Sequence, residues 1–429
     1  MTNTQKAHEF LRTHGMHPDQ LDMEAELRKF RANMENGLAG KYGLSDCKML
    51  PAYVTVDRRP PQGEKVLTLD VGGTNLRAAL VSFTGSGPVI EELRTRTVPG
   101  LGAPITRAGF LREVAEFAAP LAGKAARLGY CFSYQAEVLP GGDGKVMKFS
   151  KEVVVDGGDG MLVCQELLDT LKDMGLPAPG TFAMVNDTVA ALLGGCAASQ
   201  DESDGWIGLI LGTGNNICYL ADTGHIKRPI PGWTAPSMVV NMESGVYSGF
   251  PQGTFDRELD TASTAPGTYG NEKMVGGVYQ GEVLSRTLAG AGELFSAGFA
   301  DRLSKAGRLT AADLSAFAMD PTAPGALADL CVTQEDRDAM DVLTDCLLER
   351  AARLVTITLA GPMEAENMGK AAPAHIVAEG STFWKNAVLR GKIEKLAEEF
   401  IFGKLGRRCT FISAESPNLT GAALAALTR

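Results

Sequence analysis

The sequence lacks the patterns of cysteine, histidine and basic residues that mark several protein classes. Its 8 cysteines are scattered without a CxxC pair, and only 5 histidines accompany them. This distribution argues against a disulfide framework or a zinc finger, both of which need cysteines at short, regular spacing. Acidic residues outnumber basic ones, 51 to 41, and the formal net charge is −10. A surface of that sign disfavours nucleic acid and anionic membranes as partners.

The sequence also has no apolar run that approaches the roughly 18 residues of a membrane span, and residues 1–6 are polar. We therefore expect a cytoplasmic protein. There is no GxxxxGK[ST] loop and no GxGxxG fingerprint. A length of 429 residues with 45% hydrophobic and 21% charged residues predicts a globular chain of two or three domains.

What is present is a β-rich run, a glycine turn and a second β-rich run over residues 66–83. Gly72 and Gly73 can both take positive φ, which predicts a hairpin. The polar residues around the turn are Asp70, Thr74, Asn75 and Arg77. Bare glycine amides suit phosphate oxygens, and a carboxylate beside them suits magnesium. An ordinary surface hairpin is the alternative interpretation.

The same device occurs again at residues 206–220, with Gly212, Thr213 and Gly214 at the turn. Each turn is entered and left through a β-like run. Two such hairpins predict an internally duplicated architecture in which one phosphate chain is held from two sides.

A third feature is Asn186-Asp187-Thr188, which joins a short apolar strand at 181–185 to an alanine- and leucine-rich helix. Ligands of open α/β sheets bind at the carboxyl ends of strands, which makes Asp187 a candidate catalytic carboxylate. The alternative is that Asp187 only caps the helix, which is worth about 1 kcal/mol.

Two further carboxylates, Glu243 and Glu272, lie beside glycine-containing breaks. We expect Glu272 near the start of a helix that continues through Tyr279 and Leu284. A glutamate in that position can also be a simple partner of the helix dipole.

Taken in order, these motifs resemble those of the hexokinases and glucokinases of the actin-like ATPase superfamily. The matching stretches are 48–51, 69–77, 132–133, 149–151, 185–189, 208–216, 241–243, 255–260 and 272–275. The resemblance implies an α/β, ribonuclease H-like fold of two domains, with a duplicated β-hairpin phosphate clamp and a cleft between the domains. The small domain would comprise residues 66–187 plus 416–429, and the large domain residues 1–65 plus 188–415.

The resemblance also implies ATP-dependent phosphorylation of the 6-hydroxyl of a hexose, with glucose the expected sugar, as in glycolysis. Asp187 would be the base, assisted by Lys151 and Arg77, although Arg77 could equally be a structural ion-pair residue. The sugar-binding residues would be Ser133, Ser150, Lys151, Asn186, Asp187, Asn216, Glu243 and Glu272. The nucleotide-binding residues would be Asp70, Gly72, Gly73, Thr74, Asn75, Gly212, Thr213, Gly214, Gly380 and Ser381. Asp70 would hold Mg²⁺ through water.

Four segments depart from the family pattern, and one of them is residues 416–421, which stand where a glycine-serine turn is usual. Tyr134-Gln135-Ala136 stands where Phe-Pro-Cys is usual, Phe149-Ser150-Lys151 where Trp-Thr-Lys is common, and Glu379-Gly380-Ser381 where Asp-Gly-Ser/Thr is usual. The preferred hexose and the phosphoryl donor therefore stay open, as does the oligomeric state. A hexokinase-like sugar sensor without catalysis, or another actin-like ATPase, are the alternatives to an active hexose kinase.

Overall fold

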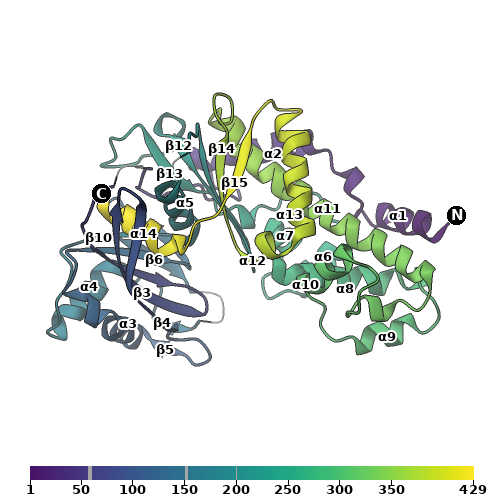
Figure 1. The fold of residues 1–429 in the computed structure, drawn as a ribbon, viewed down its shortest axis with the longest axis horizontal. Helices are drawn as coiled ribbons and strands as arrows, with labels where there is room; N and C mark the ends of the chain where they lie inside the picture. Colours follow the sequence, from purple (N-terminus) through teal and green to yellow (C-terminus); the bar gives the residue numbers. More distant parts are fainter. Residues whose placement is uncertain (57–59, 150–152, 200) are drawn as a thin grey trace.

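A computed structural model of the chain describes residues 1–56, 60–149, 153–199 and 201–429. The strands of these residues form two large sheets, and helices cover both of them (Figure 1). Two small two-stranded sheets accompany them, β5 (Ile105–Thr106) with β9 (Val155–Asp156), and β7 (Gln135–Val138) with β8 (Gly144–Lys148).

The first large sheet has the order β10-β6-β2-β3-β4 in the described residues. Its strands are β2 (Val66–Val71), β3 (Asn75–Thr84), β4 (Gly87–Thr97), β6 (Arg127–Phe132) and β10 (Thr181–Val185). The strands β2, β3 and β4 form an antiparallel meander, whereas β6 is parallel to both β2 and β10. Every residue of β2 is buried, as expected for a central strand that is covered on both faces.

The second large sheet has the order β1-β13-β12-β11-β14-β15 in the same described part of the chain. Its strands are β1 (Leu50–Pro51), β11 (Trp206–Leu211), β12 (Asn215–Asp222), β13 (Ser237–Asn241), β14 (Ala374–Glu379) and β15 (Cys409–Ile412). Here β11, β12 and β13 form the meander, and β14 is parallel to both β11 and β15. The two sheets thus share one topology, and the duplication predicted from the two hairpins is confirmed.

Helices from both halves of the chain cover the sheets, and the helix that follows the last strand of each sheet packs mainly against the other sheet. Those of the first half are α3 (Arg107–Ala122), α4 (Val163–Asp173) and α5 (Asp187–Ala198). Those of the second half and the N-terminus are α1 (Asn3–Thr13), α2 (Met23–Leu38), α6 (Thr254–Ala262), α7 (Gly270–Val275), α8 (Gly277–Gly290), α9 (Phe299–Lys305), α10 (Ala311–Met319), α11 (Gln334–Ala365), α12 (Ser381–Lys385), α13 (Ala387–Leu396) and α14 (Pro417–Leu427).

The helices α5 and α14 pack against each other between the two sheets (Figure 1). Their axes approach so closely that a Cβ at Gly421 would lie 1.8 Å from the carbonyl oxygen of Ala190. A Cβ at Gly194 would likewise lie 2.5 Å from the carbonyl oxygen of Pro417. Glycine is therefore required on both helices, because a side chain at either position would push the two sheets apart.

The helix expected to run from Glu272 through Leu284 is broken, and the prediction of a continuous helix was wrong. It ends at Val275, and α8 starts at Gly277. The amides of Gly277 and Val278 donate to the carbonyls of Gly212 (2.8 Å) and Thr213 (3.3 Å) in the turn of the second hairpin. The break therefore lets the start of α8 support that turn.

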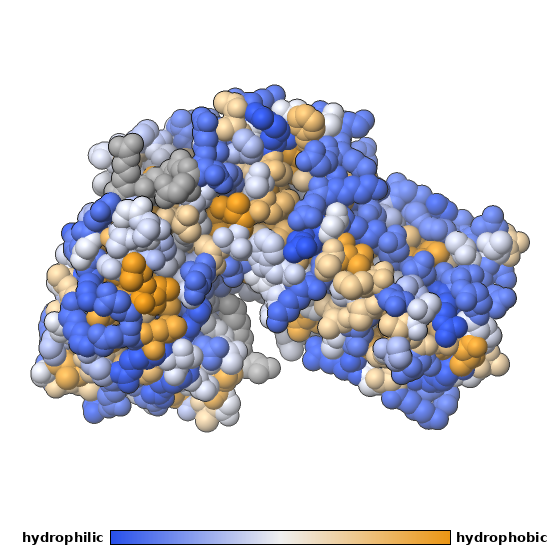
Figure 2. Space-filling model, viewed as in Figure 1, coloured by the Kyte–Doolittle hydropathy of each residue, from blue (hydrophilic) through white to orange (hydrophobic). Residues whose placement is uncertain are grey.

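The space-filling view shows the molecule hollowed between the part that contains α3 and β4 and the part that contains α8 and α10 (Figure 2). No helix in the described ranges combines the length and the apolar character that a membrane crossing requires.

We predict that Gly421→Ala lowers the free energy of unfolding by about 1–3 kcal/mol, because the added methyl group overpacks the α5–α14 contact. The measurement is urea unfolding. Gly391→Ala is the matched control, since nothing lies within 4 Å of a Cβ at that position of α13. The control should stabilise the protein by up to about 1 kcal/mol through helix propensity. Equal effects of the two substitutions would contradict the packing argument.

Candidate active site

The ends of three parallel strands place the candidate residues of the first sheet together. In the register of β2, β6 and β10, Val71 lies opposite Phe132, and Cys131 lies opposite Val185. The turn at 72–74, Ser133 and Asp187 follow directly after these strands. They therefore lie along one edge of the sheet, which is where open α/β sheets bind ligands.

Asp70, the last residue but one of β2, is almost completely buried and forms an ion pair with Arg77. The ion-pair alternative for Arg77 is thus present in the structure. Burial raises the pKa of Asp70, and the Arg77 guanidinium opposes that rise. The Oδ1 atom of Asp70 is buried and has no hydrogen-bond partner in the described part of the chain. An oxygen of this kind fits the predicted role of binding a water of Mg²⁺.

Asp187 is the first residue of α5, and the helix cap is its neighbour. The side chain of Asn186 accepts the Thr188 amide at 2.9 Å and is the N-cap, so the capping role considered for Asp187 belongs to Asn186. Asp187 Oδ1 also accepts the Thr188 amide, at 2.8 Å. The carboxylate is therefore oriented by the backbone at the positive end of a helix.

The turn of the second hairpin packs against Gly380, a position where only glycine fits. Gly380 has φ 112°, and a Cβ there would lie 2.3 Å from the carbonyl oxygen of Leu211. The Thr382 hydroxyl donates to the Gly212 carbonyl at 2.7 Å. Thr213 is exposed at the tip of the turn, as Thr74 is in the first hairpin. Both predicted phosphate turns therefore present a threonine to solvent.

Asn216 holds three segments of the site together with a fully used amide. Its Nδ2 donates to Thr188 Oγ1 and to Asn241 Oδ1, both at 2.9 Å. Its Oδ1 accepts the amides of Ile217 (2.8 Å) and Ser244 (3.2 Å). The helix start beside Asp187, the second hairpin and the loop at 243–245 are thus tied to one side chain.

The two predicted sugar-binding glutamates lie on neighbouring loops of the second half. Glu243 has φ 55°, a left-handed conformation that is uncommon for glutamate, and Asn241 Nδ2 donates to its Oε1 at 2.7 Å. Glu272 Oε2 accepts the Asn215 amide at 3.0 Å. A Cβ at Gly214 would lie only 2.2 Å from that same oxygen. The absence of a side chain at Gly214 is thus what admits the Glu272 carboxylate.

The nearby carboxylates at 256 and 260 are structural. Asp256 pairs with the buried Arg350 at 2.6 Å, and Asp260 pairs with Lys273 at 2.5 Å. Burial alone would raise the pKa of Asp260, but its bond with Lys273 leaves that pKa lowered. These two pairs fix α6 against α11 and α7.

One contact was missed by the sequence interpretation. Gln135 Nε2, in the first half of the chain, donates to the Tyr269 hydroxyl at 2.7 Å. Burial raises the pKa of Tyr269, and the hydrogen bond from Gln135 opposes that rise. The nearby carboxylates of Glu272 and Glu243 raise the pKa further. Gln135 therefore reaches across to the residue beside both glutamates. No local pattern could have indicated a contact between residues so far apart in sequence.

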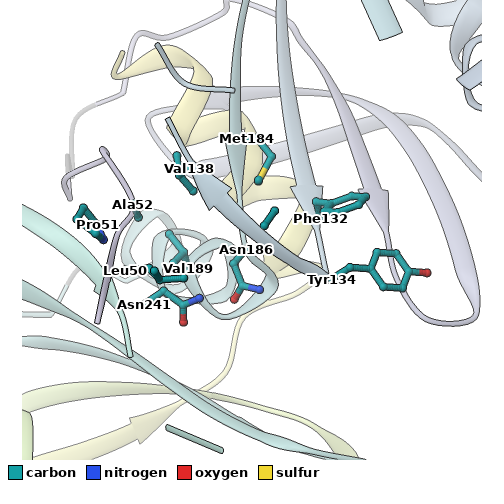
Figure 3. Close-up of a pocket in the computed structure, with 11 residues that line it drawn as sticks. Leu50, Pro51, Ala52, Phe132, Tyr134, Val138, Met184, Asn186, Val189 and Asn241 are labelled. Atoms are coloured by element: carbon teal, nitrogen blue, oxygen red, sulfur yellow. The ribbon is translucent and has the colours of Figure 1, made fainter. Parts of the chain in front are cut away.

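A small, mostly apolar pocket lies next to this constellation (Figure 3). Phe132, Tyr134 and Met184 line one side of it, and the amides of Asn186 and Asn241 are its polar groups. The Tyr134 hydroxyl donates to the Gly72 carbonyl at 2.7 Å, which ties the pocket wall to the first hairpin.

Two predicted sugar-binding residues, Ser150 and Lys151, lie outside the described residues. The remaining predicted residues lie in the two hairpins, at the strand ends near Ser133 and Asn186, in the loops of Glu243 and Glu272, and at the start of α12. Asn75 is exposed at the start of β3, and Ser381 is exposed at the start of α12.

The two-lobed architecture has counterparts among solved structures. The structure is similar to that of a hexokinase from Schistosoma mansoni complexed with glucose, with a TM-score of 0.80, 24% identity and 100% of each chain covered. A likeness at this identity establishes the fold. The predicted actin-like ATPase fold with a cleft is thereby confirmed.

Family models described as Hexokinase match residues 6–197 and 206–428. The chain therefore belongs to the hexokinase family, as its motifs predicted. It is 29% identical to Hexokinase-3 of Mus musculus over 97% of this chain and 47% of that protein. It is also 29% identical to Hexokinase-1 of Nicotiana tabacum over 92% of this chain and 85% of that protein. The chain thus spans about half the length of the mouse relative. The domain limits, the individual site residues and the compartment stay predictions.

We predict that Asn216→Ala lowers the free energy of unfolding by about 1–3 kcal/mol without any sugar present, because it leaves the Ser244 and Ile217 amides without an acceptor. Asn75→Ala, at the exposed tip of the first hairpin, is the control and should change stability by less than about 0.5 kcal/mol. Urea unfolding measures both. Unchanged stability of Asn216→Ala would show that this amide does not support the fold.

Proposed function

We propose that this chain is an ATP-dependent hexose 6-phosphotransferase with Asp187 as its base. The observation that carries the proposal is the position of Asp187 at the start of α5, on the strand edge shared by the first hairpin and Ser133. The family and the fold support sugar phosphorylation. Glucose is the expected hexose, because it is the sugar bound by the similar hexokinase from Schistosoma mansoni.

In the proposed reaction the oxygen of the sugar 6-hydroxyl attacks the γ-phosphorus of ATP. The bond from that phosphorus to the bridging oxygen breaks, ADP leaves, and Asp187 accepts the hydroxyl proton. The Thr188 amide orients Asp187, and the link from Asn216 to the Thr188 hydroxyl holds that residue against the second hairpin. The base and one phosphate turn therefore keep a fixed relation.

The two hairpin turns would supply amides and threonine hydroxyls to the phosphates from opposite sides. Asp70 would hold Mg²⁺ through its unpartnered Oδ1 and a water, and the ion would neutralise phosphate charge. Arg77, paired with Asp70, would position that carboxylate. Burial raises the pKa of Glu379, at the end of β14 in the second sheet, and the charge of Arg77 opposes that rise. The guanidinium therefore also interacts electrostatically with the second sheet.

The sugar would lie between Ser133 and Asn186 on one side and Glu243 and Glu272 on the other. Carboxylates accept two hydroxyl hydrogen bonds each, so a sugar that lacks one hydroxyl would leave a buried group unpaired. We propose that residues 66–187 with 416–429 move as one lobe relative to the rest, with the turns before α5 and α14 as hinges. Closure would exclude water, which otherwise competes with the sugar for ATP.

We predict that Asp187→Asn and Asp187→Ala lower kcat by about 10²-fold or more while glucose still binds, because only the proton acceptor is lost. A coupled assay with ATP, Mg²⁺ and a panel of hexoses measures product, and a fluorescence titration measures binding. An unchanged turnover number in both variants would refute the assigned base. If the unmodified protein phosphorylated none of the hexoses, the proposed activity itself would fail.

We further predict that Tyr269→Phe weakens glucose binding by about 2- to 13-fold, which is the net value of one hydrogen bond of 0.5–1.5 kcal/mol. The contact with Gln135 joins the two lobes beside the glutamates, so its loss should favour the open form. In a double-mutant cycle, Gln135→Leu should add little once Tyr269 is changed. Tyr279→Phe is the control. Tyr279 has a similar environment, because burial and the same Glu272 carboxylate raise its pKa, but the Gln135 amide donates to Tyr269. Additive effects of the Gln135 and Tyr269 substitutions would exclude a direct coupling.

A further inference from the structure

Three side chains from separate segments meet where the N-terminal helix α1 packs against α11. His8 is on α1, His17 directly precedes the 3₁₀ turn η1 (Pro18–Gln20), and Cys346 is on α11. Figure 1 shows α1 alongside α11 in this region. His8 Nδ1 lies 2.9 Å from His17 Nε2 and 3.9 Å from Cys346 Sγ. All three atoms lie within 4.8 Å of one another.

We propose that His8, His17 and Cys346 bind a divalent transition-metal ion, with Zn²⁺ as the chemical match. Imidazole nitrogen and thiolate sulfur are ligands that Zn²⁺ prefers. Bonds of about 2.0 Å to nitrogen and about 2.3 Å to sulfur place tetrahedral ligands about 3.3–3.6 Å apart. The separations of 2.9 and 3.9 Å differ from those values by less than about half an ångström. The third pair, His17 Nε2 and Cys346 Sγ, lies within 4.8 Å, so side-chain movements on the order of 1 Å would complete the site.

A carboxylate outside the three ligands fixes the orientation of His17. Its Nδ1 lies 2.6 Å from Asp19 Oδ1, and Arg12 holds the other oxygen of Asp19 at 2.8 Å. An unprotonated Nδ1 and the Asp19 carboxylate oxygen are both acceptors and would repel each other at this distance. Nδ1 therefore carries the proton and does not accept the Asp19 amide 3.2 Å away. The lone pair of Nε2 therefore faces His8 Nδ1, in the arrangement by which carboxylates support metal-binding histidines.

Burial and access also suit a bound ion. His17 is 8% exposed and Cys346 is 5% exposed, which leaves a dry environment for these two ligands. His8 is half-buried and opens onto a surface depression. The depression is lined by Met1, Gln5, His8, Glu9 and Arg12. An ion could enter from that side, and water could occupy the fourth position. Binding would fix α1 and the turn at residues 14–22 to α11, far along the chain.

The test uses the full-length protein after treatment with a chelator. Added Co²⁺ should bind with one equivalent and produce a thiolate-to-cobalt charge-transfer absorption, and Zn²⁺ should displace it and raise the unfolding temperature. Cys346→Ala should abolish the absorption. Cys331→Ala is the matched control, because Cys331 is also buried but its thiol donates to the Leu327 carbonyl. The control should retain the absorption.

Two further variants keep the test decisive if Cys346→Ala does not fold. His8→Gln, at a half-buried position, should weaken Zn²⁺ binding at least tenfold, and Asp19→Asn should weaken it by about 10- to 100-fold. Neither residue belongs to the proposed active site, so hexose phosphorylation should persist. The proposal is overturned if Co²⁺ gives no thiolate absorption, or if Zn²⁺ binds His8→Gln and the unmodified protein equally. In either case the three residues form only an internal hydrogen-bonded cluster.

Discussion

The contact between α5 and α14 is the constraint on which the rest of the structure depends. Each helix follows the last strand of its sheet, and each belongs to a repeat of the same topology. Gly194 and Gly421 remove the side chains that would separate them, so backbone meets backbone across the interface. Since α5 begins at Asp187, this contact also bears on where the proposed base lies relative to both sheets in the conformation described. Packing in the centre of the molecule and geometry at the candidate site are therefore one problem.

A second layer of constraint carries that geometry to the loops. Asn216 connects the start of α5 to the second hairpin and to the loop of Glu243, and it spends every hydrogen-bonding group in doing so. In a partly buried network of this kind each member depends on the others, because an unpaired amide costs more than a made bond contributes. The sequence interpretation assigned Asn216 to sugar binding. Its contacts within the protein indicate a positioning role. A bound sugar would have to share these hydrogen bonds or replace them.

The parts that could be predicted from sequence are those encoded locally. A glycine turn between two β-rich runs predicted the first hairpin, and that hairpin is present, although Gly72 does not take the positive φ on which the prediction relied. Asn186-Asp187 after an apolar strand likewise predicted a helix start, which is present at Asp187. The parts that could not be predicted depend on tertiary contacts. The pattern through Val275 and Tyr279 is helical, but the turn of the second hairpin needs donors, and the helix breaks to supply them. The link from Gln135 to Tyr269 likewise depends on how the two sheets meet.

The left-handed residues show where the fold departs from local preference. Glu243 and Tyr269 both adopt positive φ, 55° and 57°, at a cost on the order of 1–3 kcal/mol each when no glycine relieves it. Both lie in the loops that present the glutamates, and Tyr269 is the partner of Gln135. The predicted phosphate turns at 72–75 and 212–215, in contrast, contain no residue with φ in the left-handed region. In the proposed function the two halves of the site would thus be built differently: relaxed turns would suffice for phosphate, which any nucleotide presents, whereas strained loops held by surrounding contacts would fix the carboxylates that distinguish one hexose from another.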